Sequence, residues 1–175
     1  MQRSELEHII RASGDVAQDD EIVIIGSQSI LGQFPNAPMR LLVSMEADIY
    51  PRHNPELAGR VDRAIGEGSS FHELHGYYVQ GVGPETAKLP SGWEDRLVVV
   101  KNENTNGISG LCLEVHDLAV SKLVAGRSKD LEFIQELIRH EMIRKKTMLT
   151  RLAEADLRNA ESSRISSKIE AMFSN

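Results

Sequence analysis

The sequence has only one cysteine, Cys112, so it cannot form an internal disulfide. It also lacks any cluster of Cys and His with the spacing of zinc ligands, which excludes the zinc-finger classes. No stretch is apolar for long enough to span a bilayer, and residues 1–8 carry charges where a signal peptide needs an apolar core. These absences predict a cytoplasmic protein in a reducing setting, with no membrane partner.

The sequence also has no excess of positively charged residues. The formal net charge is −6 and the pI is near 5.5, so the chain as a whole repels phosphate polymers. Any contact with nucleic acid must therefore use a local basic patch. The densest basic run is Arg139-His140 together with Arg144–Lys146, which is either a solvated helix connection or a patch for RNA.

The first clear pattern is a strand, a glycine turn and a helical turn. Residues 21–25 consist of Glu21 and an unbroken run of four β-branched apolar residues, which predicts a strand buried on both faces. Gly26-Ser27 closes this run, and residues 27–31 fit a short helical turn with Ser27 as its N-cap. The proline-rich residues 34–38 then predict a loop.

A second strand is predicted over residues 41–50. Near its end, Glu46 and Asp48 alternate with apolar residues at a period of two. Side chains two apart on a strand point to the same side, so both carboxylates should share one face.

The rest of the chain divides into strands and then helices. A helix with its end at Gly14 is predicted over residues 3–12, and another over residues 55–64. Further strands are expected at 77–79, 97–100 and 111–114, the last two as a hairpin, followed by helices at 117–125, 129–140, 146–157 and 161–173. The fold class is therefore α/β (α+β): a mixed sheet flanked by helices over residues 1–140, with a helical extension over 141–175 that packs on the same domain.

The glycine turn and the carboxylate pair together suit Mg²⁺ bound to a triphosphate. Magnesium prefers hard oxygen ligands and keeps substrate phosphates in its shell, so two acids supply enough protein ligation at Glu46 and Asp48. Backbone N–H groups at Gly26-Ser27 can face phosphate oxygens, because glycine permits close approach. Taken singly, Glu-x-Asp is often a solvated face and Gly-Ser an ordinary turn. Because the acid pair lies on an otherwise apolar strand and follows the Gly-Ser turn, the two features together favour a metal and triphosphate site over these ordinary explanations.

These residues resemble a known family. Gly-Ser, an acidic-x-acidic strand and the stretch 118–130 (LAVSKLVAGRSKD) resemble the minimal nucleotidyltransferases of the DNA polymerase β superfamily. Residues 81–86, 89–97 and 116–119 are similar, more closely, to the branch related to abortive-infection toxins, which includes a family of uncharacterised function labelled DUF6036. The resemblance covers roughly residues 21–137.

The resemblance implies roles for individual residues. It implies phosphate contacts at Gly26 and Ser27, metal ligation at Glu46 and Asp48, and a nucleotide-phosphate contact by Lys122, with assistance from two neighbouring cations, Arg127 and Lys129. From the residues alone, an exposed helical face capped by Asp130 is the favoured explanation of Lys122, Arg127 and Lys129, and the resemblance shifts the balance toward a phosphate contact.

The sequence departs from the superfamily pattern in three ways. The interval from Ser27 to Glu46 is longer than usual, the first acid is Glu rather than Asp, and no third carboxylate stands out on a central strand. Glu114 and Asp117 are the nearest candidates, and Asp117 is equally an N-cap of the helix that carries Lys122. In the family a third acid helps to deprotonate the attacking hydroxyl, so binding is better supported than catalysis.

Two further features have ordinary explanations. His72 and His75 suggest a metal pair, but a partly exposed polar turn before the next strand is favoured. Trp93 is a candidate for stacking on a base, or a loop anchor on the core.

Three functions follow from these residues. The first is a nucleotidyltransferase that moves a nucleotide from an NTP to tRNA, another RNA or a protein, including as a toxin with a cognate antitoxin protein. The second is a catalytically degenerate fold that binds nucleotide or a partner without turnover. In the third, the acids are surface residues only.

Overall fold

Ile22, Val23 and Ile24 form the centre of the sheet in the computed structural model, which describes residues 1–174. Their side chains are at most 1% exposed, so the strand β1 (Glu21–Ile24) is buried on both faces, as its apolar run predicts. Strand β2 (Glu46–Pro51) pairs with β1 in antiparallel orientation, and β5 (Ser109–Cys112) pairs with it in parallel.

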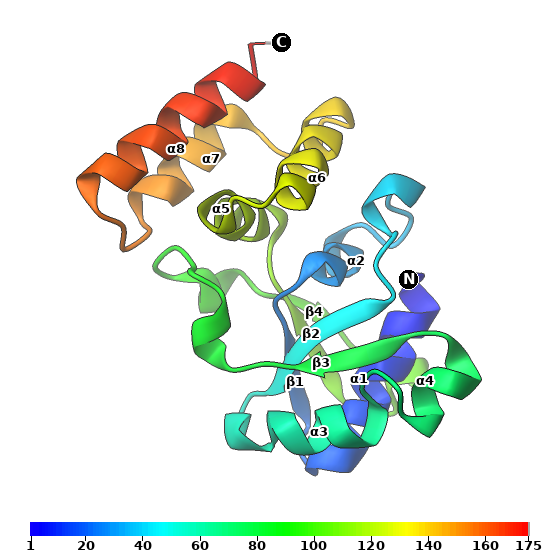
Figure 1. The fold of residues 1–175 in the computed structure, drawn as a ribbon. Helices are drawn as coiled ribbons and strands as arrows, with labels where there is room; N and C mark the ends of the chain where they lie inside the picture. Colours follow the sequence, from blue (N-terminus) through cyan, green and yellow to red (C-terminus); the bar gives the residue numbers. More distant parts are fainter. Residues whose placement is uncertain (175) are drawn as a thin grey trace. The chain divides into compact units, whose positions relative to one another are not determined.

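Two outer strands complete a mixed sheet within residues 1–174. Its order is β3-β2-β1-β5-β4, with β3 (Tyr78–Gly81) parallel to β2 and β4 (Val98–Val100) antiparallel to β5 (Figure 1). Val98 lies opposite Cys112, so the hairpin predicted between these two runs is confirmed. The predicted α/β class with a mixed sheet is also confirmed.

Helices α1 (Arg3–Ala17) and α3 (Ala58–Ile65) pack on the sheet. Leu6, Ile9 and Ile10 of α1 are completely buried, as their spacing on one stripe predicts. The prediction that α1 ends at Gly14 was wrong. A Cβ on Gly14 would lie 2.8 Å from side-chain carbons of Ile108, so this glycine serves close packing inside a longer helix.

The glycine turn leads into a short helical segment. A 3-10 turn at Ser27–Ser29 runs into α2 (Ile30–Gln33). The N-cap position belongs to Gly26 and no side chain caps the turn, so the prediction of Ser27 as N-cap was wrong. Other 3-10 turns lie at Met39–Leu41, Pro55–Leu57, Pro84–Thr86, Trp93–Arg96 and Glu103–Thr105.

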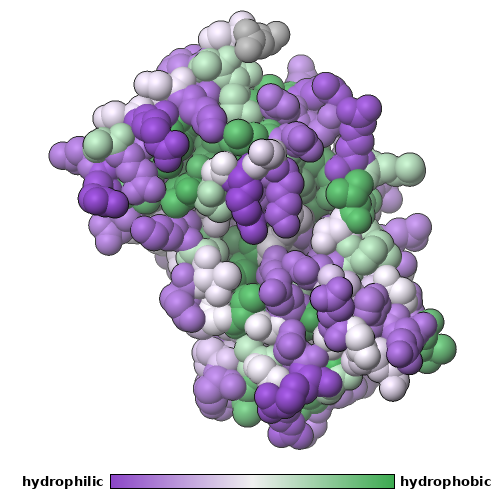
Figure 2. All heavy atoms as spheres, viewed as in Figure 1, coloured by the Kyte–Doolittle hydropathy of each residue, from purple (hydrophilic) through white to green (hydrophobic). Residues whose placement is uncertain are grey.

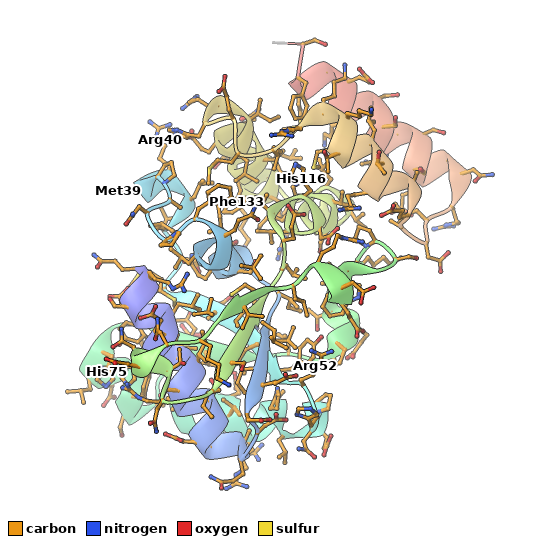
Figure 3. All side chains as sticks on the ribbon, turned by 180° about the vertical axis from the view of Figure 1, so that it is seen from behind. Met39, Arg40, Arg52, His75, His116 and Phe133 are labelled. Atoms are coloured by element: carbon orange, nitrogen blue, oxygen red, sulfur yellow. The ribbon has the colours of Figure 1, made fainter. Side chains whose placement is uncertain are left out.

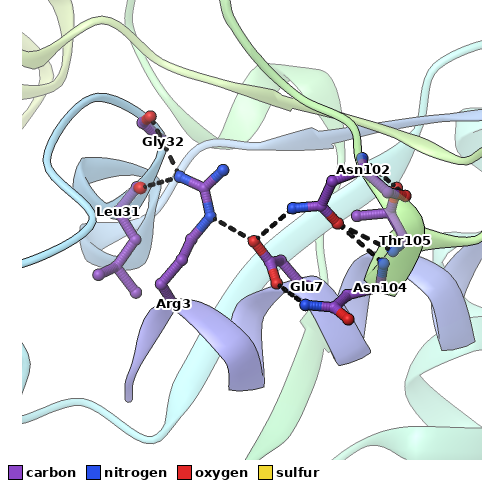
Figure 4. A network of polar contacts seen from close by, with 7 residues as sticks. All are labelled: Arg3, Glu7, Leu31, Gly32, Asn102, Asn104 and Thr105. Carbon is purple, nitrogen blue, oxygen red and sulfur yellow. Dashed lines mark hydrogen bonds and ion pairs between the residues drawn. The ribbon is translucent and has the colours of Figure 1, made fainter.

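A polar network around the buried carboxylate of Glu7 ties α1 to the segment behind the glycine turn (Figure 4). Arg3 donates hydrogen bonds to the carbonyl oxygens of Leu31 and Gly32 at the end of α2. The same guanidinium donates to Glu7 at 2.9 Å, and that carboxylate also accepts from the side-chain amides of Asn102 and Asn104. Charge-assisted bonds of this kind fix the position of α2 on the first helix.

The remaining helices are α4 (Ser70–His75), α5 (Val115–Ala125), α6 (Ser128–Arg139), α7 (Lys145–Ala153) and α8 (Asn159–Met172). The last four confirm the helices predicted after the sheet. Helix α4 was missed: its sequence was predicted to be a polar turn, yet Ser69 accepts a hydrogen bond from the backbone of His72 and caps a short helix.

The chain forms two compact units. The first comprises Met1–Thr86 and Leu97–Glu114 and holds the sheet with α1 to α4. The second comprises Ala87–Arg96 and the chain from Val115 onward, where α5 packs on α6 and α7, and α7 packs on α8. The division at residue 140, with the extension packed on the first domain, stays a prediction.

Hydrophilic side chains cover most of the surface in the view of Figure 2. Among the described residues, no helix is long and apolar enough to cross a membrane. The largest exposed apolar side chains include Met39, which is 85% exposed and labelled in Figure 3 in the segment before β2.

Candidate metal and nucleotide site

Glu46 and Asp48 lie on one face of β2. Ala47 and Ile49 alternate with them and are completely buried on the other face, whereas both acids are half-buried. The predicted alternation is therefore present, and it leaves both carboxylates within reach of solvent and of each other.

The glycine turn lies directly against the second of these acids. A Cβ built on Gly26 would be 1.8 Å from Oδ2 of Asp48, so no residue with a side chain fits here without moving the carboxylate. The backbone of Gly26 is extended, with a φ of −86°, and the requirement for glycine is one of space rather than conformation. The backbone N–H of Ile25 donates to the carbonyl oxygen of Asp48 at 3.0 Å and holds the turn beside the strand.

Two side chains of the neighbouring strand β3 complete the cluster. Tyr78 lies opposite Glu46 and Gln80 opposite Asp48 in the parallel register. The Tyr78 hydroxyl donates to Oε2 of Glu46 at 3.3 Å. With its amide nitrogen turned toward β2, Gln80 donates to Oε1 of Glu46 at 3.1 Å and to Oδ1 of Asp48 at 3.0 Å. One exposed amide thus contacts both acids.

Sequence reasoning missed Tyr78 and Gln80. The strand was predicted to end at Val79, before the second polar residue of the pair. A signal was present, because Tyr78-x-Gln80 repeats the two-residue spacing of Glu46-x-Asp48 and the two strands are neighbours.

The electrostatics of Tyr78 reflect its position beside these acids. Burial raises the pKa of Tyr78, and the negative charge of Glu46 raises it further. The hydroxyl therefore stays protonated and donates to Glu46. The ring of His72 lies against it with 4.5 Å between ring centroids, which fixes the orientation of the tyrosine.

Unpaired polar groups are concentrated in the glycine turn. Gln28 and Ser29 are completely buried, and neither amide atom of Gln28 nor the hydroxyl of Ser29 has a hydrogen-bond partner among the described residues. Buried polar atoms without partners are uncommon and mark places where water, an ion or a ligand is bound. Together with the hard oxygen donors of β2 and β3, they fit a divalent cation and its phosphate ligand.

The predicted basic residues belong to the second unit. Lys122 of α5 is buried, donates to Oδ1 of Asp130 at 3.1 Å, and lies 4.6 Å from the ring centre of Phe133, which is labelled in Figure 3. Arg127 donates to Oδ2 of the same carboxylate at 2.7 Å. Lys129 is exposed. The alternative of an exposed helical face therefore holds for Arg127 and Lys129 but not for Lys122.

Asp130 is the centre of this cluster. Its burial raises its pKa, but the hydrogen bonds from Arg127 and Lys122 outweigh burial, so the pKa of Asp130 lies below its ordinary value. The carboxylate stays ionised and holds both cations. Both cations are thereby fixed beside one buried carboxylate.

Another acidic cluster lies at the opposite end of β1. Asp19, Asp20 and His53 place one ligand atom each within 4.8 Å of one another. Asp19 is buried and already accepts hydrogen bonds from the backbone of Glu21, His53 and Asn54, and it contacts Nδ1 of His53 at 2.8 Å. These contacts join the start of β1 to the turn after β2, so the cluster has a structural role that accounts for its geometry.

A family model described as "Nucleotidyltransferase of unknown function (DUF6036)" matches residues 4–173 of the chain. The chain belongs to this family. No curated protein and no solved structure matches it significantly. Nucleotidyltransferases generally use a divalent metal, and the oxygen-rich cluster beside Gly26 provides suitable ligands for one.

The two candidates for a third carboxylate in the chain differ in position. Asp117 is completely buried in the first turn of α5 rather than at its N-cap. It accepts two hydrogen bonds from Arg96, at 2.8 and 3.0 Å, and lies 3.3 Å from Nε of Arg151. Glu114 is half-buried and follows β5, two residues beyond the pairing of Cys112 with Ile24. It therefore lies at the same end of the sheet as the glycine turn.

His72 and His75 do not form a metal pair. The Nδ1 atom of His72 accepts a hydrogen bond from the backbone of Gly68, and its ring packs on Tyr78. His75 belongs to a separate ring cluster with His8, Phe71 and Tyr77. The ordinary structural explanation accounts for both histidines, although in a helix rather than a turn.

Proposed function

We propose that the protein is a metal-dependent nucleotidyltransferase that transfers a nucleotide from a nucleoside triphosphate to an RNA or protein acceptor. The observation that carries the proposal is the position of Glu46 and Asp48 on one strand face, with Gly26 packed against the Asp48 carboxylate. Glu46 and Asp48 are the proposed ligands of Mg²⁺. When bound, the cation supplies charge neutralisation for the triphosphate and for the leaving pyrophosphate.

The proposed reaction is attack by an acceptor hydroxyl oxygen on the α-phosphorus. A new P–O bond forms to the acceptor, the bond to the β-phosphate breaks, and pyrophosphate leaves with the electron pair. Gly26 and Ser27 are proposed to contact the phosphates through the backbone, because the missing side chain at Gly26 lets a ligand approach the turn. The protein acts mainly by positioning the groups and balancing their charge.

Lys122 is the proposed nucleotide-phosphate contact of the second unit, assisted by Arg127 and Lys129. The proposal rests on the family resemblance and on the contacts of Lys122 and Arg127 with Asp130, which hold the two cations side by side. Since Lys122 is buried and held by Asp130, its ammonium group is fixed in one position, which suits recognition of a phosphate better than a mobile side chain does.

The proton of the acceptor hydroxyl needs a base. Asp117 is completely buried whereas Glu114 is half-buried, so Glu114 is the better candidate of the two. Its position after β5, level with the glycine turn, supports this assignment. Glu114→Gln is expected to lower the transfer rate about 10²–10⁴-fold while nucleotide binding is retained.

The acceptor is proposed to be tRNA, another RNA or a protein side chain, and the biological role that of a toxin neutralised by a cognate antitoxin protein. In the predicted RNA patch, Arg139 donates to Glu136 at 2.7 Å and Lys145 forms an ion pair with Glu170. Arg144 and Lys146 are exposed and are the residues of this run best placed to bind phosphate.

The alternative is a degenerate nucleotidyltransferase that binds nucleotide or a partner without turnover. The amide of Gln80, on the strand beside the acid pair, favours this alternative, because a neutral amide cannot act as a base.

One experiment separates the two functions. The protein is incubated with each labelled nucleoside triphosphate, Mg²⁺ and total tRNA, and in parallel with its own chain as the protein acceptor. Transfer that Asp48→Ala lowers by at least about 10²–10³-fold supports the enzyme. Saturable Mg²⁺-dependent binding without transfer to any acceptor supports the binding module, and no binding at all contradicts both.

A further inference from the structure

The side-chain amide of Gln80 contacts both acids of the pair at nearly equal distances. Its end atom lies 3.1 Å from Oε1 of Glu46 and 3.0 Å from Oδ1 of Asp48. These two carboxylates come from β2 and the amide from β3, where Gln80 is directly opposite Asp48. Three polar ends from two strands therefore converge on one point on the solvent-accessible side of the sheet.

The oxygen and the nitrogen of a side-chain amide occupy nearly equivalent positions but have different chemistry. Its nitrogen donates hydrogen bonds and its oxygen accepts them or binds a metal, and reversal of the group exchanges the two without moving the rest of the side chain. With the nitrogen toward β2, Gln80 satisfies two carboxylates that would otherwise repel each other. With the oxygen toward β2, three oxygen atoms face one another, an arrangement that only a cation stabilises.

The spacing matches that of magnesium ligands. Oxygen ligands at about 2.0–2.1 Å from an octahedral Mg²⁺ lie about 3 Å from their nearest neighbours around the ion. The contacts of Gln80 with Glu46 and Asp48, at 3.1 and 3.0 Å, have this length. Asn and Gln side-chain oxygens are among the hard oxygen donors that bind such ions, so the chemistry fits as well as the distance.

We propose that Gln80 is a third protein ligand of the cation held by Glu46 and Asp48, and that its amide reverses when the cation binds. Without metal, the nitrogen bridges the two acids and keeps them together. With metal, Oε1 of Gln80 replaces that bridge as a ligand. The proposal rests on the metal site of the proposed function. It adds Gln80 to that site as a neutral ligand of the cation and, when no metal is bound, as the hydrogen-bond donor to both acids.

Tyr78 offers a matched control. It lies on the same strand as Gln80 and also contacts Glu46, but through a hydroxyl that donates a hydrogen bond to Oε2 at 3.3 Å. If Gln80 were likewise only a donor, its loss would free the acid oxygens and leave cation affinity unchanged or higher. If it is a ligand, its loss must lower the affinity.

The test measures binding of Mn²⁺ alone to the wild-type full chain and three variants, with free Mn²⁺ counted by electron paramagnetic resonance. Gln80→Leu is expected to raise the Kd for Mn²⁺ about 10–100-fold, and Tyr78→Phe by less than about threefold. Gln80→Glu, which adds a charged ligand, is expected to lower the Kd. Unchanged or tighter binding by folded Gln80→Leu would overturn the proposal.

A second measurement needs only the wild-type fold. In protein labelled with ¹⁵N-glutamine, the signal of the Gln80 side-chain NH₂ is identified by its loss in Gln80→Leu. Addition of Mg²⁺ should shift this signal strongly, and Asp48→Asn should abolish the shift. A signal that stays in place while Mn²⁺ binds would contradict the role of Gln80 but leave the metal site intact. Failure of the wild type to bind Mn²⁺ would instead contradict the proposed function itself.

Discussion

The α-carbon of Gly26 packs so closely against the carboxylate of Asp48 that an added Cβ would lie 1.8 Å from its Oδ2 atom. The strand that ends at the glycine turn and the strand that carries the acids are thereby fixed in contact. The backbone φ of Gly26, −86°, suits any residue, so the conformation of the turn does not require glycine. The close contact with Asp48 does.

Gly26→Ala should therefore damage the site more than the fold. The methyl group displaces the Asp48 carboxylate, and overpacking of this kind costs about 1–3 kcal/mol of stability. The Kd for Mn²⁺ should rise at least about tenfold, measured by electron paramagnetic resonance. The control is Gly59→Ala in α3, where the nearest atom to an added Cβ is an Arg63 nitrogen at 3.7 Å. It should leave Mn²⁺ binding unchanged and raise stability by about 0.5–1 kcal/mol.

Asp117 should be a structural residue. Its buried carboxylate accepts two hydrogen bonds from Arg96 and lies 3.3 Å from Nε of Arg151, so Asp117→Asn removes a buried negative charge that faces two guanidinium groups. Chemical denaturation should show a loss of about 3–5 kcal/mol in the free energy of unfolding. Asp95→Asn, at an exposed position of the same unit, should change stability by less than about 0.5 kcal/mol. Full stability of Asp117→Asn with loss of transfer would make Asp117 the missing base instead.

Asp130 should hold Lys122 and Arg127 in place. Asp130→Asn removes the charge that both cations contact and is expected to cost about 3 kcal/mol of stability, measured by denaturation, because Lys122 is buried. Its effect on triphosphate binding should be matched by Lys122→Met but not by Lys129→Ala, since Lys129 is exposed. Equal loss of binding in all three variants would point to general electrostatics rather than a positioned Lys122.

The contact between Asp19 and His53 should give a measurable pH dependence. The hydrogen bond and charge of Asp19 raise the pKa of His53, while burial of Asp19 is outweighed by bonds from His53 and the Glu21 backbone, so the pKa of Asp19 is lowered. NMR titration should show a lower His53 pKa in Asp19→Asn than in the wild type.

The sign of this effect follows from the two shifts. The contribution of His53 is fully present below about pH 6.5 and is lost as pH rises through its raised pKa. The contribution of Asp19 is present above about pH 4 and is lost as pH falls through its lowered pKa. The stability difference between wild type and Asp19→Asn should thus be largest between about pH 4 and 6.5. A difference that grew above pH 8 would contradict this account.

Much of the fold could be predicted because local patterns and tertiary structure agree. The apolar run at Ile22–Ile24, the alternation around Asp48 and the amphipathic helices after residue 115 each have one stable structural solution. The end of α1 could not be predicted at Gly14, because the packing of Ile108 against that glycine involves residues far apart in the chain.

The site was predictable only in part for the same reason. Glu46 and Asp48 are neighbours in sequence, and their shared face follows from strand geometry alone. The role of Gln80 depends on the register between β2 and β3, and the pairing of Asp117 with Arg96 and Arg151 depends on which helices meet. Neither can be read from local spacing.

The central claim is that the cation binds at Glu46 and Asp48. Its most direct test is Mn²⁺ binding by Asp48→Asn compared with Asp20→Asn, which alters the acidic cluster at the other end of β1 through an exposed side chain. The account predicts that Asp48→Asn raises the Kd at least about tenfold, whereas Asp20→Asn binds as the wild type does. Loss of binding in Asp20→Asn with wild-type affinity in Asp48→Asn would contradict it.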